Sequence, residues 1–329
     1  MDYVTRKSEK FMKNGNRKFI EGGVMHVYQR AIHGFNIFYT LSDYLVFYTI
    51  FSVFTRRFDI CALAMCMMID HFHALLVCES KVRLSRFISS VTALYARLFN
   101  ETAGRKGQLF DKSFGSAPKF TEKQIRTAVP YVFNNPVEKY LTEDPVEYRW
   151  NFLAYLSSDC PFSEKLCVSK SSRRLRSAIK EVESCHSLGL WLNYSQLDRL
   201  FRCLSEVERE QLIDFIIRTY SVFDWEKLLS YYKSQDMMLL AIRSTTGSEY
   251  DIKEEHSRFS DIHYSDIERY IKDGLSLTPK SLLTMSVEEK QGLAKSIESN
   301  TGAAMRQVAK YLHLPLNSGR KSGGDSRGR

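Results

Sequence analysis

The sequence lacks the features that would place the chain outside the cell or in a membrane. Its seven cysteines are odd in number and include no Cys-x-x-Cys pair, which argues against a disulfide framework and a zinc ribbon. The most hydrophobic stretch, 44–54, is too short to span a bilayer and runs directly into charged residues. No apolar segment follows the basic first twenty residues, so no signal peptide is expected. These absences predict a cytoplasmic protein with reduced cysteines and no membrane partner.

Acidic residues are fewer than basic ones, 38 against 47, and the formal net charge is +9. A basic surface favours a polyanionic partner, and nucleic acid is the commonest one. The alternative is a basic surface that serves only solubility, and charge alone does not separate the two. With 44% hydrophobic residues the chain can bury real cores, and its 329 residues suit two domains of ordinary size.

A polar motif, Asp70-His71-Phe72-His73, interrupts the apolar run 61–78. Both the odd-numbered and the even-numbered positions of the run are apolar, as in a strand that is covered on each face. Histidines two residues apart on a strand point to the same face, so both imidazoles could bind one ion. The alternative is a pair of core histidines satisfied by backbone groups, and so short a motif does not decide between them.

Hydrophobic periodicity in the first half predicts the order β-α-β-β-α-β-α. The predicted strands are 24–32, 61–69, 72–78 and an extended stretch at 108–119. Three helices are predicted: the first begins at an N-cap at Ser42, the second spans about 85–101, and the third follows the capping box Thr121-x-x-Gln124. The last helix is expected to end near Asn135, because Pro136 disfavours α geometry in the residue before it. This order predicts an α+β domain, an antiparallel sheet with helices packed on it.

Two polar residues of the last of these helices, Tyr131 and Asn135, are four apart and therefore share a face. Tyr131 is a potential nucleophile. Asn135 supplies a neutral oxygen ligand that suits a hard cation such as Mg²⁺ or Mn²⁺. Taken separately, Tyr131 also fits a half-buried packing residue, and Asn135 before Pro136 fits a helix stop.

The two motifs, taken together, resemble a known family. The segment 68–76 contains His-Phe-His, and about sixty residues later the segment 131–141 reads Tyr-Val-Phe-Asn-Asn-Pro-Val-Glu-Lys-Tyr-Leu. In this order and spacing they are similar to the single-tyrosine HUH transposases, specifically the REP-associated tyrosine transposase group. Further matches at 27–30, 36–38, 109–110 and 144–150 extend the resemblance over about residues 20–155.

The resemblance implies an HUH, ferredoxin-like nuclease domain with metal-dependent transposase activity on single-stranded or hairpin DNA. It implies that His71 and His73 are metal ligands with Asn135 as the third, and that Tyr131 attacks a DNA phosphate and keeps a 5′-phosphotyrosine. A bound Mg²⁺ or Mn²⁺ would withdraw charge from the phosphate, which a phenol needs at neutral pH. The implied setting is the bacterial nucleoid, with a monomer or homodimer in which Tyr131 serves its own site or a partner's.

The chain departs from the family in two places. After Trp150 the family usually has serines, whereas this chain has Asn151-Phe152, and the other departure precedes the first histidine. Pro-Asn usually precedes the first histidine, whereas this chain has Ile69-Asp70. The added carboxylate either orients a histidine or helps bind the ion, or it marks a drifted copy. The alternative functions are therefore a domesticated, catalytically silent hairpin-DNA-binding protein, and an unrelated α+β protein whose histidines and tyrosine are core residues.

Six basic residues of this half are candidate DNA contacts, although a solvated basic face is the alternative. They are Arg30, Arg83, Arg86, Arg97, Arg105 and Lys106. After a basic arm at 1–20 and the HUH domain at 21–158, we expect an all-helical C-terminal part in two regions, 159–243 and 244–314, and a disordered basic tail at 315–329.

The two helical regions carry their own boundary signals. Helices are predicted at 173–183, 195–204, 206–220 and 224–234, a linker at 244–259, and two further helices at 286–299 and 303–312. Capping boxes are predicted at Ser195-x-x-Asp198, Ser205-x-x-Glu208 and Ser286-x-x-Glu289. The last two flank a turn at Gly302 and resemble a helix-turn-helix DNA reader; a plain helical hairpin is the alternative.

Overall fold

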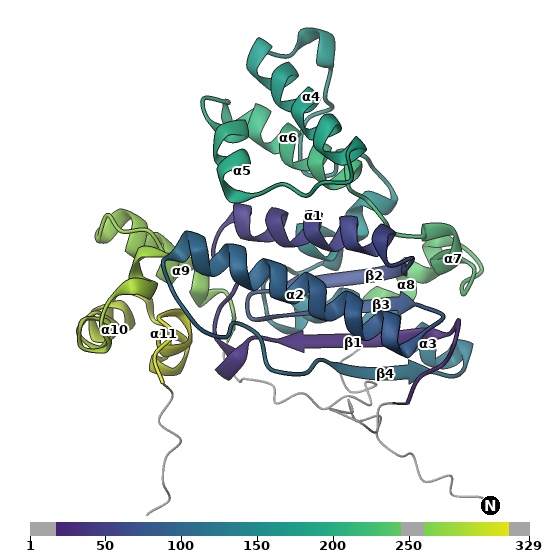
Figure 1. The fold of residues 1–329 in the computed structure, drawn as a ribbon, viewed down its shortest axis with the longest axis horizontal. Coiled ribbons are helices and arrows are strands. Elements are labelled where there is room, and N and C mark those ends of the chain that lie inside the picture. Colours follow the sequence, from purple (N-terminus) through teal and green to yellow (C-terminus); the bar gives the residue numbers. More distant parts are fainter. Residues whose placement is uncertain (1–17, 245–259, 316–329) are drawn as a thin grey trace, which may run out of the picture.

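The computed structural model describes residues 18–244 and 260–315, and its first half has the predicted order of elements. These are β1 (Val24–Arg30), α1 (Leu41–Arg57), β2 (Cys61–Met68), β3 (His71–Val77), α2 (Lys81–Ala103), β4 (Gly115–Lys119) and α3 (Glu122–Glu138) (Figure 1). The predicted α+β class, with further helices towards the C-terminus, is confirmed. All seven cysteines are free.

The sheet has four strands in the order β2-β3-β1-β4, and every neighbouring pair is antiparallel. In the β1–β3 pair, Tyr28 lies opposite His73 and Arg30 lies opposite His71. Ile69 and Asp70 form the turn that joins β2 to β3. Because side chains alternate along a strand, a slip of one residue in this register would turn both histidines to the other face.

The two faces of the sheet are covered by different helices. On one face, Phe72 of β3 packs with Phe47 of α1 in a core that α2 completes; these two helices lie in front of the sheet in Figure 1. On the other face, Leu75 of β3 packs with Val129 and neighbouring residues of α3. His71 and His73 lie four and two residues before Leu75 on the same strand, so their side chains point to the same face as Leu75, towards α3.

The predicted end of α3 near Asn135 is wrong, because the helix includes Pro130 and Pro136 and continues to Glu138. A proline inside a helix removes one backbone hydrogen bond. For Pro130 the carbonyl that loses its partner is that of Arg126, and it accepts a hydrogen bond from the hydroxyl of Tyr232 (3.3 Å). Tertiary packing therefore compensates for the backbone hydrogen bond that the proline removes, so the helix continues where the sequence predicted its end.

Other helix ends differ from the prediction by four residues or fewer. The N-cap of α1 is Thr40, whose capping box uses Asp43, and α2 begins after an N-cap at Ser80. The helix predicted to start at the Ser195 box begins instead after Asn193, which pairs with Gln196. The predicted capping boxes at Thr121, Ser205 and Ser286 are confirmed.

The middle of the chain forms helices around the domain. In Figure 1, α4 (Arg173–Ser187), α5 (Tyr194–Phe201) and α6 (Glu206–Thr219) lie above α1. The helix predicted at 224–234 is shorter, α7 (Trp225–Leu229), and a helix that was not predicted, α8 (Gln235–Ser244), follows it; α7 packs against β2 and α8 against α3. Short 3₁₀ helices occupy Ile32–Gly34, Pro145–Glu147, Arg149–Asn151, Leu153–Leu156 and Val168–Lys170.

The last described part, 260–315, is helical and returns to the start of the domain. It contains α9 (His263–Arg269), a π-helical segment (Tyr270–Gly274), a 3₁₀ turn (Ser281–Thr284), α10 (Val287–Thr301) and α11 (Met305–Tyr311). The hydroxyl of Tyr39 donates to the carbonyl of Tyr311 at 2.6 Å, and His313 Nε2 lies 2.7 Å from the carbonyl oxygen of Asn36. Most of the predicted arm, linker and tail lies outside the described residues. Within them, no helix is both long and apolar enough to cross a membrane.

Candidate active site

The two histidines of β3 lie side by side on the sheet face that α3 covers. Both His71 and His73 are buried, and their ring centroids are 5.1 Å apart at nearly a right angle. Phe72, between them, points into the opposite core. The prediction that the two imidazoles share a face is confirmed.

Tyr131 of α3 packs against His73, one member of this pair. Its ring centroid is 5.3 Å from that of His73 in an edge-on arrangement, and its side chain is buried. The packing of α3 on β2 and β3 brings Tyr131 to the histidines from a distant part of the sequence. The two motifs of the sequence therefore meet in one place.

Asp70 holds the ring of His71 from the turn between β2 and β3. Its Oδ1 lies 2.5 Å from Nδ1 of His71. Nε2 of His71 is buried and has no hydrogen-bond partner among the described residues. A carboxylate on one ring nitrogen with the other nitrogen left for a metal ion is a common arrangement around bound metals, so the geometry at His71 fits a metal ligand.

The carboxylate of Asp70 is also close to two cations. Its Oδ2 lies 3.9 Å from Nε of Arg30 and 3.7 Å from Nζ of Lys310. Burial acts to raise the pKa of Asp70, but His71 and then the two cations outweigh burial and hold this pKa well below its usual value. Asp70 is therefore ionised and can act as an acceptor at neutral pH.

His26 of β1 is a site residue that the sequence analysis missed. Its Nε2 lies 3.0 Å from Nδ1 of His73, and its ring centroid is 5.3 Å from that of Tyr131. Burial, and then the neighbouring His73 and the charge of Lys119, lower the pKa of His26 well below 6.5, which keeps its imidazole neutral. The alternation of His26, Tyr28 and Arg30 along one strand face was the sequence signal that could have found it.

Tyr28, the next residue on that face, completes the group of rings. Its centroid is 4.7 Å from that of His73 and 5.4 Å from that of His71. Tyr28 of β1 thus lies against both histidines, and Tyr131 of α3 lies against His73. Packing of this kind restricts the rotamers of the histidines.

Asn135 lies one helical turn after Tyr131 and is buried. Its Nδ2 donates to the backbone carbonyl of Tyr131 at 2.8 Å. The amide nitrogen of Asn135 is thus hydrogen-bonded within the helix, and its amide oxygen is the candidate metal ligand. Across residues 18–244 and 260–315, no three His, Cys, Asp or Glu side chains are grouped to hold a metal ion. An ion at the histidine pair would therefore need a ligand of another type, such as this amide oxygen.

The candidate DNA contacts are distributed over two faces of the domain. Arg30 lies beside Asp70 at the histidine site. Arg83, Arg86 and Arg97 belong to α2, which covers the opposite face of the sheet, and Arg83 pairs with Asp59 at 3.1 Å. The α2 residues therefore do not line the histidine site, and their contact with DNA stays a prediction.

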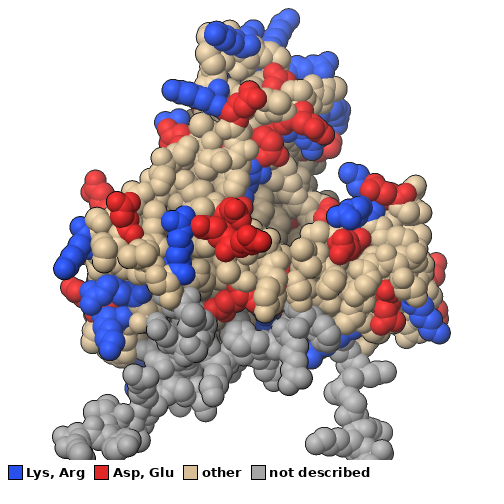
Figure 2. All heavy atoms as spheres, turned by 180° about the vertical axis from the view of Figure 1, so that it is seen from behind, with Lys and Arg blue, Asp and Glu red and all other residues tan. Residues whose placement is uncertain are grey.

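The last two of these candidates follow the end of α2. Arg105 donates to Oδ1 of Asn100 (2.7 Å) and to the carbonyl of Gln108 (3.1 Å), and Lys106 is exposed. From behind, Lys and Arg alternate with Asp and Glu over the described surface (Figure 2). The charge pattern on this face therefore does not by itself mark a DNA path.

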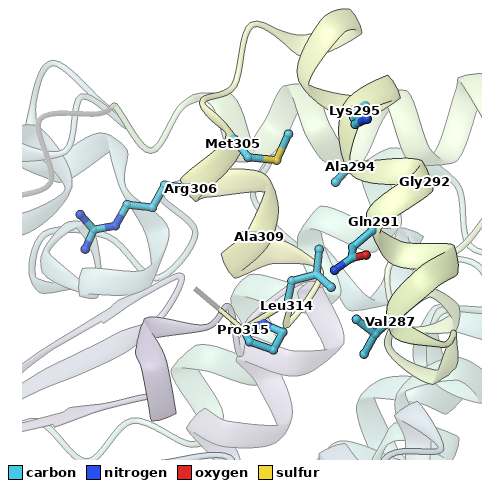
Figure 3. A pocket seen from close by; sticks show the side chains of 10 residues that line it. All are labelled: Val287, Gln291, Gly292, Ala294, Lys295, Met305, Arg306, Ala309, Leu314 and Pro315. Carbon is cyan, nitrogen blue, oxygen red and sulfur yellow. The ribbon is translucent and has the colours of Figure 1, made fainter. Parts of the chain in front are cut away.

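The C-terminal helices add one more group to the site and form a groove of their own. Lys310 of α11, which the sequence analysis did not select, is the residue that reaches Asp70. The groove between α10 and α11 is lined by Gln291, Met305 and Leu314 among others, while Arg306 points away from α10 (Figure 3). The predicted turn at Gly302 is confirmed, since Gly302 is the left-handed C-cap of α10. The DNA-reading role of these helices stays a prediction.

Comparison with known proteins gives two matches. Residues 26–135 match the family model described as transposase IS200 like. A solved structure of a REP-associated tyrosine transposase bound to a REP hairpin is 18% identical, over 42% of this chain and 81% of that chain, with a TM-score of 0.34. No curated protein matches the chain.

Proposed function

We propose that this chain, whose residues 26–135 match the IS200-like transposase family, breaks and rejoins single-stranded DNA with Tyr131 as its nucleophile. The observation that carries the proposal is the contact of Tyr131 with His73, which itself lies against His71 on the same face of the sheet. Core histidines would need no phenol beside them. A nucleophile and two imidazoles in contact are the parts that phosphoryl transfer with a divalent ion requires.

The proposed reaction is an attack of the Tyr131 oxygen on a DNA phosphorus atom. A tyrosyl O–P bond forms, the bond from phosphorus to the 3′-oxygen breaks with its electron pair, and the phenolic proton is lost to solvent. A 3′-OH can reverse the attack, because the phosphotyrosine keeps the energy of the phosphodiester bond. Cleavage and rejoining therefore need no ATP.

We propose His71, His73 and the Asn135 oxygen as the residues that would hold Mg²⁺ or Mn²⁺. When bound, the ion would polarise the phosphoryl oxygens and lower the charge that opposes the tyrosyl oxygen. The chain's own contribution is to fix the two imidazoles and to hold Tyr131 against His73. Because Tyr131 is only 2% exposed, DNA reaches it only after the surface around it opens.

The experiment uses the full chain, Mn²⁺ and single-stranded hairpins from its own flanking DNA, labelled at the 3′ end. We expect a covalent protein–DNA adduct on a denaturing gel, formed by wild type and lost with EDTA and in Tyr131→Phe. Tyr140→Phe is the matched control, since Tyr140 follows the same helix and is exposed. An adduct from Tyr131→Phe would refute the role of Tyr131. Hairpin binding by wild type without any adduct would instead favour the silent DNA-binding protein.

A further inference from the structure

His26 and His73 meet across the β1–β3 pair through one nitrogen of each ring. Nε2 of His26 is 3.0 Å from Nδ1 of His73, and both side chains are completely buried. We propose that His26 is a positioning residue that fixes the tautomer of His73, with the proton on Nδ1 and the lone pair on Nε2. This inference rests on the proposed function, in which His73 is a metal ligand.

The hydrogen bond between the two rings has two arrangements, and only one leaves His73 able to bind a metal ion. A neutral imidazole has one donor and one acceptor nitrogen, and the partner of one nitrogen sets the role of the other. If His26 donates, the lone pair of His73 Nδ1 is used and Nε2 carries the proton. If His73 donates from Nδ1, its Nε2 keeps a lone pair for the metal ion. The second arrangement requires His26 to accept at Nε2 and to carry its own proton on Nδ1.

His71, the neighbouring candidate ligand, has a partner at the same ring nitrogen, but the partner is a carboxylate. Nδ1 of His71 is engaged by the carboxylate of Asp70, and Nδ1 of His73 is engaged by the imidazole of His26. In both rings Nδ1 has a hydrogen-bond partner, so Nε2 is the nitrogen that would bind the metal ion. Partners of this kind fix ring orientation and tautomer, and removing one typically costs 10–100-fold in metal affinity.

The strand register gives His26 this position. Opposite His73 on β1 is Tyr28, and His26 lies two residues away, opposite Leu75. His26 therefore reaches His73 diagonally, along a face where such neighbours are within reach of long side chains. Its ring also contacts that of Tyr131, so one residue supports both the candidate ligand and the candidate nucleophile. The alternative is that His26 only fills space, and the test below separates the two roles.

The first measurement determines the tautomer of His73 without metal or DNA. In ¹⁵N-histidine-labelled full-length protein, long-range ¹H–¹⁵N correlations report which ring nitrogen carries the proton, and a His73 variant assigns the signals. We expect Nδ1–H in wild type and in His26→Gln, whose amide oxygen can accept the bond. We expect Nε2–H, or a mixture, in His26→Phe, which keeps a ring but has no acceptor. A proton on Nε2 of His73 in wild type would overturn the inference without any variant.

The second measurement is Mn²⁺ affinity, followed by the EPR signal of the free ion. We expect His26→Phe to weaken binding by roughly 10–100-fold and His26→Gln to recover most of it. Equal losses in the two variants, or no loss in His26→Phe, would show a packing role and refute the proposal. A failure of the proposed function would look different, because wild type would then give no DNA adduct whatever the tautomer of His73.

Discussion

Asp70 shows how much one carboxylate can determine at the scale of a residue. It is the partner of His71 Nδ1 and also lies near Arg30 and Lys310. These contacts satisfy a mostly buried charge that would otherwise be costly. The related family usually has asparagine at this position, whose amide oxygen can accept the same bond.

We therefore predict different results for two substitutions of Asp70. Asp70→Asn keeps an acceptor for Nδ1–H of His71, so its Mn²⁺ affinity and its DNA adduct should stay within roughly tenfold of wild type. Asp70→Ala removes the acceptor, and Mn²⁺ affinity should fall by roughly 10–100-fold. Titration with Mn²⁺ measures both variants. Unchanged affinity in Asp70→Ala would mean that the carboxylate does not orient His71.

At the scale of elements, α3 positions the chemistry and its start is defined by a capping box. The hydroxyl of Thr121 accepts from the backbone N–H of Gln124 at 3.2 Å, while the Gln124 side chain accepts from the N–H of Thr121 at 3.3 Å. The helix then carries Tyr131 and Asn135 to the sheet. Its first turn is exposed, so capping and not burial stabilises this end.

Thr121→Ala should lower the free energy of unfolding by about 1 kcal/mol. Thr127→Ala is the matched control, since Thr127 lies in the middle of the same helix and its hydroxyl bonds only to the carbonyl of Lys123. That control should change stability by no more than about 0.5 kcal/mol. Urea unfolding gives both values, and equal effects would argue against the capping box.

His313, which follows α11, leads to a prediction about how the stability of the protein depends on pH. Burial lowers the pKa of His313 to about 3, and its Nε2–H donates to the carbonyl of Asn36. Since the unfolded chain has a pKa near 6.5, it binds more protons than the native state between about pH 3 and pH 6.5. Stability should therefore rise with pH through this range, by on the order of 5 kcal/mol.

His313→Gln keeps a donor for Asn36 but does not titrate. Urea unfolding at a series of pH values should give a flatter profile for this variant than for wild type between pH 3 and 6.5. The two profiles should converge in shape above pH 7, where both side chains are neutral. Equal slopes in the acid range would show that another group is responsible.

At the scale of the whole molecule, Asp43 joins three parts of the chain. It closes the capping box of α1, accepts from the hydroxyl of Tyr194 in α5 at 2.7 Å, and pairs with Lys280 of the C-terminal part at 2.6 Å. Its side chain is fully buried. A single carboxylate thus connects the sheet domain with both helical regions.

Asp43→Asn should lower the free energy of unfolding by about 3 kcal/mol, because Lys280 loses its charge partner in a buried site. Asp59→Asn is the control, since Asp59 also pairs with a cation, Arg83, but is almost fully exposed. We expect no measurable loss in that variant. Chemical unfolding measures both, and a small effect of Asp43→Asn would show that the three parts are joined mainly by apolar contacts.

The sequence alone determined the features that depend on neighbours along the chain. Periodicity gave the order of elements, the spacing of His71 and His73 gave their common face, and side-chain chemistry gave three capping boxes. These features are predictable because they arise from the geometry of single strands and helices. Family resemblance then connected the histidines with Tyr131.

Only the tertiary structure decided which distant groups would meet. His26 joins His73 through strand pairing, Lys310 reaches Asp70 through the docking of α11, and α3 continues past Pro130 with the help of Tyr232. No local pattern encodes these contacts, since each depends on how whole elements pack. The histidine pair was visible in the sequence, and the surroundings that make it a candidate site came from the fold.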